Sequence, residues 1–512
     1  MLLFTVYGFM IMFSWYMLKT LREPLLLVRA TPETKSYAYG LVAVLLLIIV
    51  PLYGTLFQNV PQKRLGLWVN GSLISVLFVF FLLTWTNLDI GFAYYVWVGV
   101  FGVLISAQFW AFAADTFNLK AGQRIFPLIM IGVSLGGLLG PTLAGNLFKI
   151  VGPQFLMLIT VLILAMTLPL INWSRNAVPA DSRSHDARRD MKTNELLGGF
   201  SLILQNRYLL LIACLVVLLN WVNTTGEYLL AEFVVRHAET VVAADPTKDK
   251  GAIIAGFYGT FFSTVNAASL LLQMFLVSRL LRWIGLQGAI MILPLIAVLG
   301  YGLMAFFPIF TMIRIVKIME NSTDYSIMNT ARHVLFLPLS TTEKYEAKIA
   351  IDAFFWRFGD VIQAGVIYVG LNVLHFQTRE FALLNMALAM VWIVLALQLG
   401  RLYIRQKKMV TLDEPPQLVM QLRIQPARAG CALDYRLPAR LFVVSDPGDV
   451  LTISVRPVDG GALPAWLKFD AETLQFRGTP PADLSESTWL TVRATNMEGA
   501  WTETRLGFDH QC

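Results

Sequence analysis

The sequence has little charge. Asp, Glu, Lys and Arg make up only 14% of its 512 residues, against 56% hydrophobic residues. Mean hydropathy is +0.63. A water-soluble chain of this length needs far more charge to cover its surface, so the composition excludes an ordinary soluble protein. It predicts an integral membrane protein instead.

Cysteine and histidine are also scarce. Cys214, Cys431 and Cys512 show no CxxC or Cys/His spacing, and the five histidines are scattered. Metal ligands usually recur at such spacings, so no metal site is expected. The sequence shows no nucleophile with a base and no phosphate-binding glycine loop. We therefore expect neither an enzyme nor a bound cofactor.

Apolar runs long enough to cross a bilayer recur along the chain. A spanning helix needs about 20 mostly apolar residues. Twelve such runs are predicted at Met1–Leu18, Tyr39–Phe57, Leu65–Thr84, Ile90–Ala114, Phe126–Leu147, Phe155–Trp173, Tyr208–Tyr228, Ala252–Val277, Ile284–Phe307, Pro308–Leu337, Ile349–Leu374 and Phe381–Ile404. The first run leads into a charged segment rather than a cleavage site, so we interpret it as a span and not a signal peptide.

Six spans on either side of a polar segment are typical of a transporter built from two repeated halves. The predicted fold is an all-α polytopic membrane protein of about twelve transmembrane helices in two six-helix halves, major facilitator-like, with a small C-terminal β-sandwich. The expected domains are an N-terminal bundle (1–173), a cytoplasmic central loop (174–199), a C-terminal bundle (200–405), a linker (406–418) and the sandwich (419–512).

Lys and Arg collect in the even-numbered loops. These residues include Lys63, Arg64, Lys120, Arg124, Arg279, Arg282, Lys344 and Lys348. The positive-inside rule then predicts a multi-pass protein of a bacterial inner membrane with both termini in the cytoplasm. Because the basic residues follow the topology, the net charge of +7 does not indicate nucleic-acid binding. Lys19, Arg22, Arg29 and Lys35, after the first span, are an exception to the rule, and a water-filled cavity for an anion would account for it.

The sequence changes character near residue 417. Short strands are predicted at Gln421–Ile424, Leu441–Val444, Leu451–Val455, Leu474–Phe476, Trp489–Val492 and Arg505–Phe508. The segments Asp446–Asp449, Leu463–Asp470 and Phe476–Pro480 resemble cadherin-like immunoglobulin modules. Such modules usually lie outside the cytoplasm, which conflicts with the topology from charge. A protein partner for this domain is one expectation.

Charged residues within spans are costly unless they face a cavity or a partner. In the first span Lys19, Arg22 and Glu23 share a helical face, although a charged turn that reaches the headgroups would look the same. In the seventh span a polar stripe of Asn220, Asn223 and Thr224 ends at Glu227. Such a stripe either packs against another helix or forms a substrate or proton site.

The tenth span is densest in charge. Arg314, Lys317, Glu320 and Asp324 fall within a helical face of about 120°, and Arg332 continues it. Lys348 and Asp352 follow. Alternating signs are compatible with internal ion pairs. Recurrent basic groups also suit a polyanionic ligand such as a phosphate ester.

The fifth span is rich in glycine. Small residues spaced four apart allow two helices to approach closely. Its core, Gly136-xxx-Gly140–Pro141-xx-Ala144–Gly145, resembles the antiporter motif of major facilitator transporters.

Four stretches resemble the ATP/ADP translocase family of nucleotide exchangers. They are Leu18–Glu23; Phe109–Ala113 with Arg124–Leu128; Asn206–Leu210 leading to Glu227; and Tyr325–Arg332 with Leu337–Leu339 and Ala347–Asp352. The resemblance implies twelve spans, alternating access and a central basic site for nucleotide phosphates. Lys19, Glu227, Arg332 and Lys348 match functional or invariant charges of the family. Val98 stands where the family has an acidic residue, Arg332 replaces what is often a lysine in the family, and the β-sandwich is an addition.

These observations predict a secondary transporter of a nucleotide or another phosphorylated anion, in contact with membrane lipid. The expected substrate-binding residues are Lys19, Arg22, Asn223, Glu227, Arg314, Lys317, Asp324, Arg332, Lys348 and Asp352. The basic residues would neutralise substrate charge, and Glu227 with Asp324 or Asp352 would carry a proton or pair with those bases. One alternative is a proton-coupled carrier of a non-nucleotide metabolite. Another is a membrane-embedded sensor or assembly factor whose β domain binds a partner.

Overall fold

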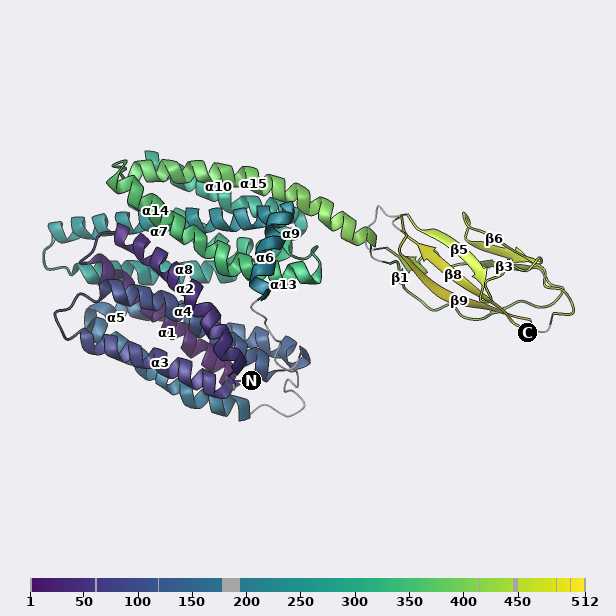
Figure 1. Ribbon diagram of the computed structural model, residues 1–512, viewed down its shortest axis with the longest axis horizontal. Coiled ribbons are helices and arrows are strands. Elements are labelled where there is room, and N and C mark those ends of the chain that lie inside the picture. The colour runs from purple at the N-terminus through teal and green to yellow at the C-terminus, as the bar shows by residue number, and fades with distance from the viewer. Residues whose placement is uncertain are drawn as a thin grey trace. The chain divides into compact units, whose positions relative to one another are not determined.

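The computed structural model describes residues 2–59, 62–117, 119–176, 194–413, 415–444, 450–484, 486–497 and 499–510. The core of the expected central loop, 177–193, lies outside the described residues, as do the side chains of Lys63, Arg64, Lys120, Arg124 and Lys344 and the turn Asp446–Asp449. The chain divides into two compact units, Met1–Gly400 and Arg401–Cys512. Figure 1 shows the first as helical and the second as mostly β-strand.

The helical unit confirms the predicted membrane fold. Its helices are α1 (Leu2–Leu27), α2 (Glu33–Asn59), α3 (Gln62–Leu83), α4 (Gly91–Thr116), α5 (Leu119–Asn176), α6 (Asn194–Gln205), α7 (Arg207–Ala244), α8 (Lys250–Phe275), α9 (Val277–Trp283), α10 (Gly285–Phe306), α11 (Phe310–Thr323), α12 (Asn329–Leu335), α13 (Thr341–Ala350), α14 (Trp356–Asn372) and α15 (Thr378–Asp413). Within the described residues, 8 helices are long and apolar enough to cross a membrane. Each of the twelve predicted runs overlaps a helix.

Several predicted spans are not single straight helices. The fifth and sixth are the two arms of α5, which meet at Gly152 with φ 75°. Glycine adopts this conformation without strain. Pro153, which has no backbone N–H to donate, then begins the second arm of the helix. The tenth and eleventh spans contain π-helical segments at Asp324–Met328 and Ile351–Phe355. Such single-turn irregularities often occur at functional sites.

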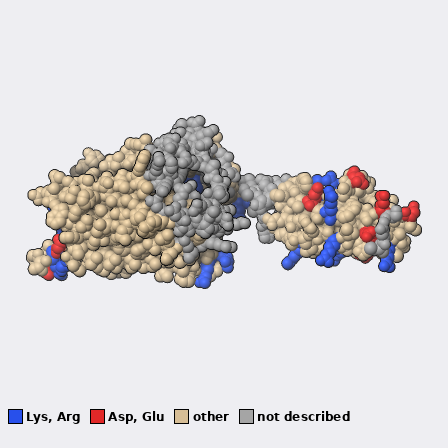
Figure 2. All heavy atoms as spheres, turned by 90° about the horizontal axis from the view of Figure 1, so that it is seen from below, with Lys and Arg blue, Asp and Glu red and all other residues tan. Residues whose placement is uncertain are grey.

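The surface of the helical unit agrees with a lipid environment. Large apolar side chains such as Ile48, Leu162, Leu299 and Val394 are exposed on its helices. In Figure 2 the visible, described face of this unit is almost free of charged side chains between its two ends. Lipid-facing positions require this composition, because no water is available there to solvate charge.

The glycine motif of α5 is a contact surface for α1. A methyl group at Gly136 would lie 2.5 Å from the Phe9 carbonyl oxygen, and one at Gly140 would lie 2.5 Å from that of Phe13. Further along α5, Gly145 lies against Gly259 of α8. The glycines therefore bring three helices to backbone contact, as the spacing of small residues predicts.

Replacing Gly140 with leucine should force α1 and α5 apart and cost about 1–3 kcal/mol or more, as overpacked cores do. Thermal unfolding of the purified protein in detergent measures this loss. Gly365→Ala is the matched control, because no described residue lies within 4 Å of a methyl group at that helical glycine. We expect the control to keep or slightly raise the melting temperature. Equal melting of Gly140→Leu and wild type would contradict the contact.

The β unit is a sandwich with its own core. Its strands are β1 (Gln417–Leu418), β2 (Gln425–Pro426), β3 (Leu433–Arg436), β4 (Phe442–Val443), β5 (Thr452–Pro457), β6 (Leu467–Asp470), β7 (Gln475–Gly478), β8 (Thr488–Thr495) and β9 (Trp501–Asp509). The sheets have the orders β1-β4, β2-β9-β8-β5 and β3-β7-β6. Phe476 of the three-stranded sheet packs on Phe508 of the four-stranded one, with ring centroids 5.6 Å apart. The two larger sheets therefore bury one common apolar layer.

One predicted strand is wrong. Gln421–Ile424 is unpaired, and pairing begins only at Gln425, which aligns with Phe508 in a parallel ladder. Ile424 is 55% exposed, so the segment buries no continuous apolar face against a sheet. The strands β1, β2, β3 and β6 were not predicted. β3 and β6 alternate charged with apolar residues over only four positions each, a weak signal.

Asp470 should make the β unit sensitive to acid. The Thr473 hydroxyl and the amides of Glu472 and Thr473 donate to its carboxylate and lower its pKa. A lowered folded-state pKa means stabilisation that is present above the unfolded value of about 3.9 and lost as pH falls through the folded value. We expect Asp470→Ala to lower the melting temperature of this unit at pH 7. The difference should vanish near pH 2, and an unchanged difference there would contradict the assignment.

Candidate functional site

A cavity of ≈ 660 Å³ lies among helices of both halves of the helical unit. It is lined by residues of α1, α2 and α4 on one side and of α7, α8, α12, α14 and the first π-helical segment on the other. This volume is typical of a site for a small molecule. Its polar lining residues are Trp15, Tyr16, Lys19, Arg22, Tyr39, Tyr95, Ser106, Asn220, Asn223, Thr224, Glu227, Asp324, Tyr325, Asn329, Arg332, Trp356, Arg357 and Asp360.

Lys19 faces this cavity from α1. Its Nζ lies 4.4 Å from the ring centroid of Phe262 on α8 and 5.4 Å from that of Tyr16. No described carboxylate lies within ion-pair distance of it. Lys19 is therefore a cation held by aromatic faces, with its charge available to a ligand.

Arg332 faces the same cavity from the opposite half. Its guanidinium lies 4.4 Å from the ring centroid of Trp356, and its Nη2 donates to Asn329 Oδ1 at 3.2 Å. Among the described residues no carboxylate forms an ion pair with it. Each of these two residues follows a π-helical segment in the sequence: Arg332 follows the first segment and Trp356 follows the second.

A second arginine that lines the cavity already forms an ion pair. Arg357 Nη1 lies 3.5 Å from Asp360 Oδ2. Asn220 Nδ2 donates to Asp360 Oδ1 at 2.7 Å, and Thr224 Oγ1 lies 2.9 Å from the same oxygen. Asn220 and Thr224 of the polar stripe of α7 thus anchor a buried carboxylate of α14, which agrees with the packing interpretation, and both also line the cavity.

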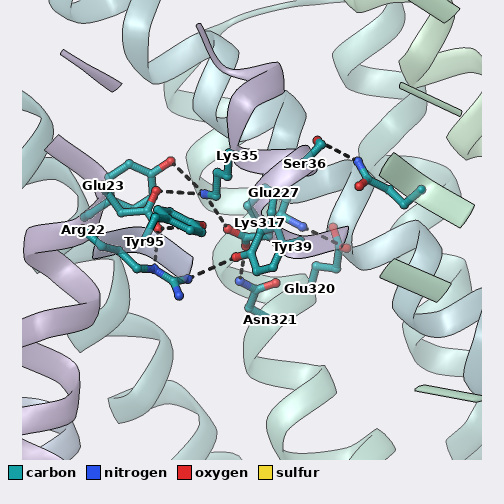
Figure 3. Close-up of polar contacts among 12 residues, drawn as sticks. Arg22, Glu23, Lys35, Ser36, Tyr39, Tyr95, Glu227, Lys317, Glu320 and Asn321 are labelled. Atoms are coloured by element: carbon teal, nitrogen blue, oxygen red, sulfur yellow. Dashed lines mark hydrogen bonds and ion pairs between the residues drawn. The ribbon is translucent and has the colours of Figure 1, made fainter. Parts of the chain in front are cut away.

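Beside the cavity lies a buried ion-pair network, hereafter the Lys35 network, formed by Arg22, Glu23, Lys35, Glu227 and Asn321 (Figure 3). Lys35 Nζ lies 3.1 Å from Glu23 Oε2 and 3.3 Å from Glu227 Oε2. Arg22 Nε contacts the other oxygen of Glu23 at 3.3 Å, and Asn321 Nδ2 donates to Glu227 Oε1 at 3.0 Å. Lys35 therefore joins α1 and α2 of the first half to α7 of the second.

Two further contacts close the same region. Gln363 Nε2 of α14 donates to Ser36 Oγ of α2 at 2.9 Å. Next to them a methyl group at Gly40 would lie 2.9 Å from Ala364 Cβ. The halves are thus in close contact where α2 meets α14.

Lys317 and Glu320 form a separate buried pair behind the cavity. Their charged atoms lie 3.0 Å apart, and the Tyr301 hydroxyl donates to Glu320 Oε1 at 2.8 Å. Neither residue lines the cavity. The absence of a side chain at Gly226 gives Lys317 and Tyr301 the room to meet α7.

The structure brings six of the ten predicted site residues to the cavity. These are Lys19, Arg22, Asn223, Glu227, Asp324 and Arg332. The other four lie elsewhere. Lys317 lies behind the residues that line the cavity, and Arg314 Nη2 donates to Thr260 Oγ1 at 3.2 Å. Lys348 of α13 pairs with Asp352 of the second π-helical segment at 2.6 Å, and both side chains are partly exposed. Their role in binding stays a prediction.

Sequence reasoning did not place Lys35, Trp356, Arg357 or Asp360 in the site. Lys35 was counted as a loop charge, yet its side chain is 0% exposed. The only signal for Lys35 in the sequence was that it breaks the positive-inside rule. Trp356 gave none, because an aromatic residue in an apolar run is ordinary. No group of three or more His, Cys, Asp or Glu that could hold a metal occurs in the described part of the chain.

Comparison with known proteins agrees with this architecture. Residues 300–403 match the family model of TLC ATP/ADP transporters, and residues 415–508 match the He_PIG family of Ig domains. The sequence is 25% identical over 358 residues to ADP,ATP carrier protein 1 of Chlamydia muridarum, covering 61% of this chain and 65% of that protein. It is 21% identical over 407 residues to the protein of the same name from Chlamydia pneumoniae, covering 70% and 75%.

Solved structures show the same fold. The crystal structure of nucleoside transporter NupG aligns with a TM-score of 0.58 at 14% identity, over 78% of this chain and 98% of that one. A POT family transporter in complex with 5-aminolevulinic acid aligns with a TM-score of 0.55 at 12% identity, over 79% and 96%. The predicted resemblance to the ATP/ADP translocases and to immunoglobulin modules is confirmed. This chain is a multi-pass membrane protein with a transporter fold, similar in sequence to ADP,ATP carriers.

Proposed function

We propose that this protein is a secondary transporter that moves a nucleotide or another phosphorylated anion across the inner membrane by alternating access. The observation that carries the proposal is the pair of cations in the cavity. Lys19 and Arg332 come from opposite halves and face one space, and neither forms an ion pair with a described carboxylate. A phosphate chain supplies the negative charge that this arrangement lacks.

The aromatic lining supports an aromatic anion in particular. Trp15, Tyr16 and Trp356 line the same cavity beside the two cations. A nucleobase can stack on such rings while its phosphates contact the basic groups. The similarity to ADP,ATP carriers supports the same substrate class.

The ion-pair network beside the cavity supports alternating access. Lys35 joins helices of both halves, and α2 contacts α14 nearby. A ligand that binds residues of both halves can shift the balance between arrangements only if its contacts differ between them. Cations from both halves satisfy this condition, because the distance between Lys19 and Arg332 must change when the halves rock.

Counter-exchange in proteoliposomes tests the proposal. Vesicles containing the purified protein and loaded with ATP should accumulate labelled ADP, saturably, and empty liposomes should not. Unloaded vesicles with the protein separate exchange from net uptake. If no nucleotide and no phosphate ester moves in either mode, the proposed function is wrong.

One observation favours a second candidate. Val98, Gly99, Gly102 and Val103 of α4 give that side of the cavity an uncharged surface. Such an uncharged surface would fit a proton-coupled carrier whose substrate has less charge than a nucleotide. Saturable proton flux driven by a non-nucleotide solute, in the absence of nucleotide, would distinguish it. For the sensor or assembly-factor alternative, we expect no flux together with stable capture of a protein through residues 421–508.

A further inference from the structure

The four-stranded sheet of the β unit has an outward face that the proposed transport function does not use. Side chains alternate along β8 and β9, so residues on either side of the buried ones point away from the core. Trp489 and Arg493 of β8, Trp501 and Arg505 of β9, and Arg456 of β5 lie on this side. We call these five residues the Trp–Arg face.

The two tryptophans of this face are exposed but held in place. Trp489 pairs with Gly507 across the ladder, and a methyl group at Gly507 would lie 3.0 Å from its indole. Its ring therefore lies flat over the glycine. The Arg493 guanidinium lies 4.0 Å from the ring centroid of Trp501. Trp489 is 43% exposed and Trp501 48% exposed, so both present a fixed ring to the surroundings.

Positive charge gathers between these rings. Arg493 Nη2 and Arg456 Nη2 share Glu503 Oε2 at 3.0 Å and 3.5 Å. Arg505 is exposed and forms no ion pair with a described carboxylate. The other acid of strands β5, β8 and β9 is Asp509, which lies at the end of β9 beyond Trp489, within reach of the Ser487 hydroxyl. Three arginines against one glutamate thus leave an excess of positive charge between the tryptophans.

We propose that the Trp–Arg face docks on the anionic lipid headgroups of the membrane that the helical unit spans. Tryptophan is favoured at the membrane–water interface, and arginine binds lipid phosphates. Chain connectivity keeps the surface within reach. The last span runs over Thr378–Lys407, and β1 begins at Gln417, ten residues after its end. A tether this short gives the membrane a high effective concentration that a free ligand lacks.

Depth-dependent quenching on the full-length protein tests this docking. A fluorophore is attached to Thr452→Cys, exposed on β5 at the edge of the Trp–Arg face, in a background with Cys214, Cys431 and Cys512 replaced by serine. The control label is on Lys468→Cys, exposed on the other sheet. Nanodiscs contain a headgroup nitroxide and either 30% anionic or only zwitterionic lipid. We expect quenching at position 452 in anionic discs only, and none at 468.

A matched pair of variants assigns the effect to the face. Arg456→Gln with Arg505→Gln leaves the Arg493–Glu503 pair intact and should shift the docking equilibrium about 30-fold, given the usual contribution of basic residues at an anionic surface. Arg436→Gln with Arg477→Gln, on the other sheet, should change nothing. Equal quenching at 452 and 468, quenching independent of lipid charge, or no quenching at 452 would overturn the proposal. None of these outcomes depends on nucleotide transport.

Discussion

Replacing Lys35 with alanine should destabilise the helical unit by about 3–5 kcal/mol, the usual cost of removing one partner from a buried ion pair. The side chain is 0% exposed and lies between Glu23 and Glu227. Without it, two buried carboxylates face each other across the halves, with Arg22 and the Tyr95 hydroxyl left as partners of Glu23 and Asn321 left as a partner of Glu227. Thermal unfolding in detergent, with and without denaturant, measures the loss.

Two controls separate this effect from the loss of any lysine. Lys250 pairs with Glu239 at 2.9 Å, but Glu239 is 57% exposed at its side chain. Lys250→Ala should therefore cost no more than about 1 kcal/mol. In the second control, Glu227→Gln is added to Lys35→Met. Because Glu23 keeps Arg22 as its partner, that variant leaves no unpaired charge in the network and should recover most of the stability. If Lys35→Ala melts like wild type, the Lys35 network does not join the halves in solution.

Lys35 also shows where sequence reasoning stopped. The positions of the helices follow from apolar length, which a single sequence carries directly. The positive-inside pattern is broken by Lys19, Arg22, Arg29 and Lys35. A water-filled cavity was predicted to account for this exception. The structure places Lys19 and Arg22 at such a cavity and buries Lys35 in ion pairs, leaving only Arg29 exposed. The exception to the charge rule was therefore the best available signal for the site.

The tenth span illustrates a different limit. A regular helix of 100° per residue places Arg314, Lys317 and Asp324 on one face, and the sequence assigned all three to the substrate. The structure separates them, because a helix face 120° wide can touch three neighbours at once. Arg314 meets Thr260 of α8, Lys317 meets Tyr301 of α10, and only Asp324 reaches the cavity. Periodicity gives the direction of a side chain, but its partner depends on packing that one sequence does not encode locally.

Neutralising either free cation of the cavity should weaken nucleotide binding strongly. Lys19→Gln and Arg332→Gln each remove a charge that no described carboxylate balances, so the protein should fold with little change in melting temperature. Loss of a desolvated contact to phosphate typically costs about 2 kcal/mol or more, a 30-fold weaker affinity. Titration of purified variants with ATP, followed by the ligand-induced rise in melting temperature, measures it.

Arg314→Gln is the matched control for this series. It removes the same kind of charge from the same span, but its guanidinium contacts Thr260 outside the cavity. We expect its ATP affinity and counter-exchange to match wild type, whereas Lys19→Gln combined with Arg332→Gln should lose both. Wild-type ATP affinity in the combined variant would mean that the phosphates bind outside this cavity. A loss in Arg314→Gln equal to that in Arg332→Gln would mean that charge along the whole span, rather than the two cavity cations, attracts the substrate.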